Sequence, residues 1–169
     1  MTQRRNMQEA APGRRALLGA LTAAGLFLIA APLGAQSSDG PVQKIAAAKQ
    51  LFRQWLALGD AYDPRIVSLY SDAAYIVSLR IKADGTQEQR SWTGKQFKEI
   101  LRLGMEAAKQ RNDRSDYSQT EYLIEGELVR IKSLRTQAGK NKSTPHHLVI
   151  AKSSDGYWRI YQEIAVVAE

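Results

Sequence analysis

The sequence has no cysteine among its 169 residues. That absence excludes a disulfide framework, a thiolate metal site and a cysteine nucleophile. Also missing are a glycine-rich phosphate loop, a Gly-x-Ser-x-Gly nucleophile elbow and a His-Glu-x-x-His zinc helix. We therefore expect no cofactor and no metal, and neither nucleotide nor serine-nucleophile chemistry. The chain does have 44% hydrophobic residues, enough for the core of a single packed domain.

The first 35 residues have the pattern of a secretory signal peptide. Residues 1–15 hold four arginines and one acid, and residues 16–35 are uncharged and end in small side chains. This pattern predicts cleavage after Ala35 and export to the periplasm or out of the cell. The mature domain then spans residues 36–169.

Two alternatives stay open for this segment. Arg14 and Arg15 begin a run that loosely resembles a twin-arginine signal, so the export route is not decided. Residues 16–35 are also long enough to remain as a membrane anchor. Contact with a membrane is expected only if the segment is retained.

The net charge of +7 belongs partly to the signal segment. The whole chain has 24 Lys and Arg against 17 Asp and Glu, and the first 35 residues hold four of the former and one of the latter. The mature chain is therefore left with a net charge of about +4. Nucleic-acid binding loses its main compositional support, and we expect no nucleic-acid partner.

Hydrophobic periodicity predicts helices first and a run of strands afterwards. Apolar residues recur every three or four positions after Asp39-Gly40-Pro41, and Thr93 with Gln96 forms a capping box. The predicted elements are helix 41–59, a short helix from 64, strands 74–81 and 87–92, a helix from 94 to about 111, and strands 117–124, 128–136, 146–152 and 157–166. Helices segregated from antiparallel strands indicate an α+β domain.

This order, with three local strings, resembles the nuclear transport factor 2-like superfamily, which includes the SnoaL-like proteins. The strings lie at residues 59–75, 92–95 and 154–160. The resemblance implies a cone-shaped, bent antiparallel sheet packed on three N-terminal helices, the cystatin-like fold. It also implies an apolar pocket inside the cone and a homodimer built through the sheet. It does not imply one function, because the superfamily holds both enzymes and binding domains.

We expect an exported, non-catalytic domain that binds a small apolar ligand or a protein partner. The isomerase chemistry known in this superfamily needs a carboxylate base and acidic hydroxyl donors. The matching positions here carry Ser78 and Phe52, which can supply neither. No catalytic residue is therefore assigned.

An enzyme remains the first alternative: a SnoaL-like dehydratase, cyclase or isomerase that uses a histidine and a carboxylate. His146 and His147 are adjacent, so on a strand they point to opposite faces and cannot chelate one metal together. One of them can face the pocket, with Glu163 or Asp72 as the nearest carboxylate by topology.

The candidate ligand-binding residues are mostly aromatic side chains expected near the mouth of the cone. Alternation along the last strand predicts that one face, the interior, carries Trp158, Ile160, Gln162 and Ile164, and that Glu163 faces away. The predicted set is Trp55, Tyr75, Trp92, His147, Trp158 and Gln162. The alternative interpretation is that these side chains only fill the core.

A basic run follows one strand into the next loop and can be a solvated edge or a site for an anionic partner. It consists of Arg130, Lys132, Arg135, Lys140 and Lys142.

A further alternative is a membrane-anchored assembly module, because periplasmic domains of type IV secretion channels resemble this superfamily. That function requires residues 16–35 to be retained.

Overall fold

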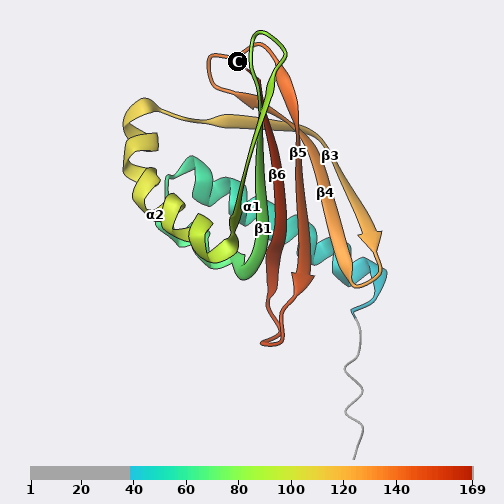
Figure 1. Cartoon of the computed structure of the whole chain (residues 1–169). Helices are drawn as coiled ribbons and strands as arrows, with labels where there is room; N and C mark the ends of the chain where they lie inside the picture. Colours follow the sequence, from blue (N-terminus) through green and yellow to red (C-terminus); the bar gives the residue numbers. More distant parts are fainter. Residues whose placement is uncertain (1–38, 169) are drawn as a thin grey trace, which may run out of the picture. The chain divides into compact units, whose positions relative to one another are not determined.

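The computed structural model describes residues 39–168 (Figure 1). The predicted signal peptide, residues 1–35, lies outside the described residues. Within the described part, no helix is both long enough and apolar enough to cross a bilayer.

Three helical segments precede or interrupt the strands. They are α1 (Pro41–Asp60), the 3₁₀ helix η1 (Pro64–Leu69) and α2 (Gly94–Arg111). Pro41 occupies the first turn of α1, where its missing N–H is not needed. The predicted capping box is confirmed: the Thr93 hydroxyl accepts from the Gln96 amide, and the Gln96 side chain accepts from the Thr93 amide.

Six strands form one open sheet, and the α+β class is confirmed. They are β1 (Tyr70–Ile81), β2 (Gln87–Thr93), β3 (Ser115–Glu125), β4 (Leu128–Gln137), β5 (Ser143–Lys152) and β6 (Trp158–Ala168). Their order across the sheet is β2-β1-β6-β5-β4-β3.

The sheet is mixed rather than wholly antiparallel, which corrects one detail of the prediction. β1 and β6 lie side by side in parallel, whereas the other neighbouring pairs are antiparallel. Parallel neighbours need a long connection. Here α2 and four strands separate β1 from β6 along the chain, so the last hairpin can return to the middle of the sheet.

The helices pack on one face of this sheet, called here the inner face. Directly paired residues of neighbouring strands point to the same side, so Ile131, Leu148 and Glu163 share the inner face with Ile76. Figure 1 shows β3 bending as it runs from the end of α2 to the far edge of the sheet. The strand's register shifts between Ser118 and Glu121, an irregularity of the kind that bends a sheet.

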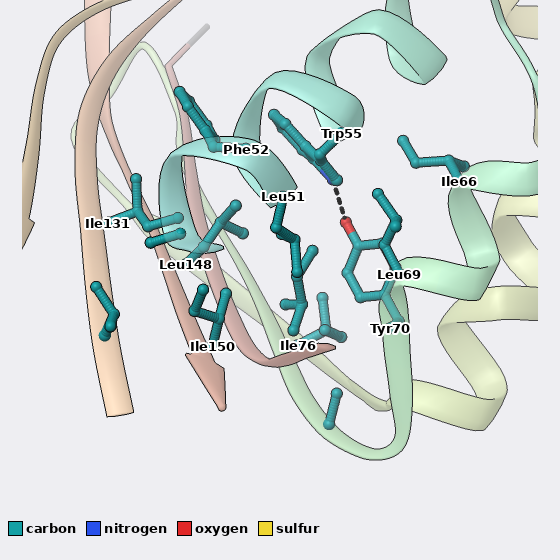
Figure 2. Packing of buried hydrophobic residues seen from close by; sticks show 14 residues of the cluster. Leu51, Phe52, Trp55, Ile66, Leu69, Tyr70, Ile76, Ile131, Leu148 and Ile150 are labelled. Atoms are coloured by element: carbon teal, nitrogen blue, oxygen red, sulfur yellow. Dashed lines mark hydrogen bonds between the residues drawn. The ribbon is translucent and has the colours of Figure 1, made fainter. Parts of the chain in front are cut away.

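The core lies between α1 and the inner face. Ala48, Leu51, Phe52 and Trp55 face the sheet from α1, as the predicted apolar stripe requires. Figure 2 shows Leu51 and Phe52 near Leu148, with Trp55 directed toward Tyr70. The rings of Phe52 and Trp55 stack with their centroids 5.8 Å apart.

Candidate functional site

A cavity of about 210 Å³ lies between the C-terminal half of α1, the helix α2 and the inner faces of β3 and β4. Its apolar walls are Trp55, Leu56, Leu101, Met105, Ala108 and Tyr117. Its polar lining is Asp60, Tyr62, Asp113, Arg114, Ser115 and Arg135. A hollow that combines apolar walls with convergent polar groups is the usual form of a small-molecule site.

Tyr117 and Arg135 are cross-strand partners on the wall of this cavity. Their pairing puts both side chains on the inner face of the sheet. Burial raises the pKa of the Tyr117 phenol well above its usual value, while the positive charge of Arg135 acts in the opposite direction. The phenol therefore stays neutral at physiological pH and is available as a hydrogen-bond donor or acceptor.

Beside the cavity, two residues at helix ends have the left-handed backbone conformation. Tyr62 follows α1 with φ 52°, and Asn112 ends α2 with φ 53°. The Tyr62 hydroxyl donates to Asn112 Oδ1 at 3.3 Å. Arg114 lies over the Tyr62 ring, 5.8 Å from its centroid. These contacts join the ends of both helices where the cavity meets solvent.

Behind the cavity wall, four buried side chains form a hydrogen-bond chain. Trp55 Nε1 donates to the Tyr70 hydroxyl at 2.8 Å, as Figure 2 shows, and that hydroxyl donates to Glu163 Oε2 at 2.6 Å. His146 Nε2 lies 3.1 Å from Glu163 Oε1. Because an indole can only donate, Tyr70 must give its own proton to Glu163. The ionised Glu163 can only accept, so His146 Nε2 carries a proton.

The imidazole of His146 has one nitrogen without a partner. Its side chain is 1% exposed, and within residues 39–168 its Nδ1 is the one buried side-chain nitrogen or oxygen that forms no hydrogen bond. The ring stacks on Trp55 at 5.3 Å and meets the edge of Tyr117 at 5.2 Å between centroids. Trp55 and Tyr117, two walls of the cavity, therefore cover the histidine.

Glu163 remains a carboxylate despite its burial. Burial by itself would raise the pKa of Glu163, but the hydrogen bonds from His146 and Tyr70 and the charge of Arg135 hold that pKa below its usual value. A buried carboxylate hydrogen-bonded to a buried imidazole is an arrangement found in acid–base sites and in structural networks alike.

Three predicted site residues lie on the inner side of the sheet. Trp55 lines the cavity itself. Trp92 packs beside Phe97 with ring centroids 6.2 Å apart, away from the cavity. Trp158 lines a separate hollow of about 230 Å³ with Leu51 and Leu69. Their role in binding a ligand stays a prediction.

The other three predicted residues are on the outer face, where the structure corrects the expected orientation. Gln162 pairs with Val149 and with Tyr75, and His147 pairs with Ile164. For Gln162 the cause is a bulge in β6. The neighbouring β5 residues Ile150 and Val149 pair with Ile160 and Gln162, so Tyr161 between them is an extra residue without a partner on β5. After this bulge the alternation shifts by one position, which turns Glu163 inward and Gln162 outward.

The two histidines do point to opposite faces, as their adjacency predicts. His146 is buried against Glu163, whereas His147 faces outward beside Lys132. Burial, together with the charges of Lys132 and Arg130, lowers the pKa of His147. Asp72, the other carboxylate considered for the histidine, instead forms an exposed ion pair with Lys98 at 2.7 Å.

No family model and no curated protein matches the sequence. Solved structures do resemble it. A nuclear transport factor 2-like protein of unknown function from Shewanella baltica superposes with a TM-score of 0.53 at 11% identity, over 75% of this chain and 94% of the other. The domain has the nuclear transport factor 2-like fold.

Two further neighbours share this nuclear transport factor 2-like fold. A protein of unknown function with a cystatin-like fold from Nostoc punctiforme has a TM-score of 0.51 at 15% identity, over 76% of this chain and 92% of that one. The β subunit of a putative aromatic-ring-hydroxylating dioxygenase from Novosphingobium aromaticivorans has a TM-score of 0.51 at 12% identity, over 76% and 90%. At these identities the likeness concerns the fold, and the function must be argued from the site.

Proposed function

We propose that this domain binds a small, mainly apolar molecule in the cavity between α1, α2 and the inner faces of β3 and β4. The observation that carries the proposal is the cavity itself, about 210 Å³, with Trp55, Leu101, Met105 and Tyr117 in its walls. Its volume corresponds to roughly seven water molecules of liquid, which suits one ring or a short chain. A larger hollow of about 550 Å³ lies along α1 and η1, but the inner face of the sheet contributes nothing to its lining.

The test is to fill the cavity. Ala108→Phe places a ring among the apolar walls, whereas Leu103→Phe puts the same ring on an exposed position of α2. With 2-phenylethanol as a neutral probe, calorimetry should show binding to the wild type and to the Leu103 variant, and a loss of about tenfold or more in the Ala108 variant. Binding unaffected by Ala108→Phe, or failure of the wild type to bind both this probe and its carboxylate analogue phenylacetate, would contradict the proposal.

Export of the protein belongs to the same proposal. Its support is the sequence pattern of residues 1–35, with a basic start, an uncharged middle and small residues at the end. Intact-mass spectrometry of the exported protein should give a chain that begins at Gln36. A mass that retains residues 16–35 would instead favour the membrane-anchored assembly module.

A homodimer through the outer face of the sheet completes the proposal. The support is that within residues 39–168 no helix covers this face, although its central strands carry apolar side chains. These are Val77, Leu79, Val149, Ile164 and Val166. Predicted site residues Tyr75, His147 and Gln162 lie on the same face, so they become candidate contacts with a second copy of the chain.

A second candidate function is acid–base catalysis, favoured by the partnerless Nδ1 of His146. Glu163 holds the opposite nitrogen of the ring, so Nδ1 can accept a proton from a carbon next to a carbonyl, with the electron pair passing to the carbonyl oxygen as an enolate. The enolate then takes the proton back from the ring. The rings of Trp55 and Tyr117 must first move aside for a substrate to reach this nitrogen.

Proton exchange tests this second function without knowledge of the substrate. In deuterated buffer, the α-protons of phenylacetone should exchange faster with the protein than with buffer alone, and Glu163→Gln should abolish the gain. His147→Gln, on the other face, is the control that should keep it. Exchange equal to that of buffer would exclude this chemistry for the probe and leave the binding function.

A further inference from the structure

A second, basic hollow of about 450 Å³ shares part of its lining with the apolar cavity. Both are lined by Asp113, Arg114, Ser115 and Arg135. The second hollow adds Arg111 and Lys140 to its walls, as well as Ala138 and Gly139 of the turn between β4 and β5. A molecule with an apolar body in the first hollow would therefore present its other end to positive charge.

Arg135 lines both hollows. Its Nε donates to Ser115 Oγ at 3.0 Å, which fixes the orientation of the guanidinium. In the part of the chain that the structure describes, no carboxylate comes within ion-pair distance of it. Other arginines contrast with this: Arg130 on the same strand is paired with Glu125 at 2.6 Å, and Arg159 with Asp155 at 2.6 Å.

Neither of the two acids in the shared or apolar lining, Asp60 and Asp113, forms an ion pair with Arg135 within residues 39–168. Asp113 is held by Arg111, whose guanidinium donates to it at 2.6 and 2.9 Å. Asp60 is exposed at the end of α1. A guanidinium offers five donors in a planar fork, and Ser115 uses one of them, so the terminal nitrogens keep the geometry that binds a carboxylate bidentately.

We propose that the ligand of this cavity is a small organic acid, with its apolar body against Trp55, Leu101 and Met105 and its carboxylate on Arg135. This inference rests on the proposed binding function and specifies the class of ligand. A carboxylate fits better than a larger anion because a single arginine with Ser115 forms the anchoring point. Arg114 and Lys140 add long-range attraction from the second hollow.

The experiment compares an acid with its neutral counterpart. Phenylacetate and 2-phenylethanol are titrated into the mature protein at pH 7.5, where the acid is ionised. We expect phenylacetate to bind about tenfold to a hundredfold more tightly than the alcohol, because only the acid forms charged hydrogen bonds with Arg135. Arg135→Gln should remove this preference, so that the acid and the alcohol bind with similar affinity.

The matched control is Arg130→Gln, because Arg130 is on the same strand but on the outer face. It should leave the preference for the acid intact. Arg135→Lys, which keeps the charge but loses the fork, should give an intermediate preference. Thermal unfolding of each variant shows whether it folds, and the comparison of the two probes on the wild type needs no variant.

The outcomes separate this inference from the function on which it rests. Equal affinity for the acid and the alcohol, both lost in Ala108→Phe, would overturn the organic-acid inference and uphold the cavity as a binding site. A preference for the acid that survives Arg135→Gln would also overturn it. Failure of both probes to bind the wild type would overturn the proposed function as well.

Discussion

At the scale of single residues, Tyr70 is the hydrogen-bond partner of two buried polar groups, the indole N–H of Trp55 and the carboxylate of Glu163. Its hydroxyl accepts from Trp55 and donates to Glu163, and Tyr70 is 1% exposed. Burial, followed by the charge of Glu163, raises the pKa of Tyr70 well above its usual value, so the hydroxyl stays protonated and able to donate.

Tyr70→Phe should therefore destabilise the protein strongly. The indole N–H and the Glu163 carboxylate each lose a buried hydrogen bond, and an unsatisfied buried group costs about 1–3 kcal/mol. We expect the free energy of unfolding in urea to fall by about 3 kcal/mol. Tyr157→Phe, at a 69% exposed position, should change it little. Equal effects in the two variants would show that the buried chain contributes nothing to stability.

The low pKa of Glu163 predicts an acid-sensitive fold. The folded-state pKa lies below the usual 4.5, so the ionised group stabilises the native state above that pH, and this contribution is lost as the pH falls through the folded-state value. The melting temperature of the wild type should therefore fall more steeply below about pH 4.5 than that of Glu163→Gln. Parallel curves for the two proteins would contradict the assignment.

The same residue shows where prediction from sequence ends. Strict alternation along the last strand put Gln162 inside and Glu163 outside, and one extra residue at Tyr161 reverses both. No local residue type marks this bulge, since it contains neither glycine nor proline. The buried partners Tyr70 and His146 lie 93 and 17 residues from Glu163 in the chain, so their meeting depends on the completed sheet.

At the scale of elements, the helix starts and the turns could be predicted because local chemistry determines them. The capping box at Thr93, the turn at Asp84-Gly85 and the apolar stripe of α1 each need only neighbouring residues. β1 begins at Tyr70, four residues before the predicted start, because the chain there pairs irregularly with β6. That pairing is long-range and leaves no periodic signal.

Gly94 fixes the approach of α2 to β1. A Cβ at this position would lie 1.9 Å from the carbonyl oxygen of Ser71, on the backbone of β1. The beginning of the helix can therefore rest directly on the strand only if residue 94 has no side chain.

Gly94→Ala should lower the free energy of unfolding by at least about 2 kcal/mol, because the helix or the strand must move. Gly104→Ala in the same helix is the matched control: a Cβ there meets nothing within 4 Å. That change should stabilise the protein by about 1 kcal/mol through helix propensity alone. Urea unfolding of both variants measures the difference, and effects of the same sign would contradict this account of Gly94.

At the scale of the whole domain, the two faces of the sheet differ in what covers them. The inner face is covered by α1 and α2, and its side chains form the core and the cavity. The outer face carries no helix within residues 39–168, yet Val77 and Val149 on it are only 8% and 5% exposed. The α+β layering could be predicted from the order of elements. The parallel pairing of β1 with β6 in the middle of the sheet could not.

A substitution in the middle of the outer face should separate a dimer into monomers. Ile164 lies on β6 between Val77 of β1 and His147 of β5, so Ile164→Lys would place a charge at the centre of the proposed contact. Light scattering after gel filtration should give twice the monomer mass for the wild type and the monomer mass for this variant. Leu103→Lys, which changes an 83% exposed residue of α2, should remain dimeric. A monomeric wild type would contradict the dimer, and a dimeric Ile164→Lys would show that copies meet through another surface.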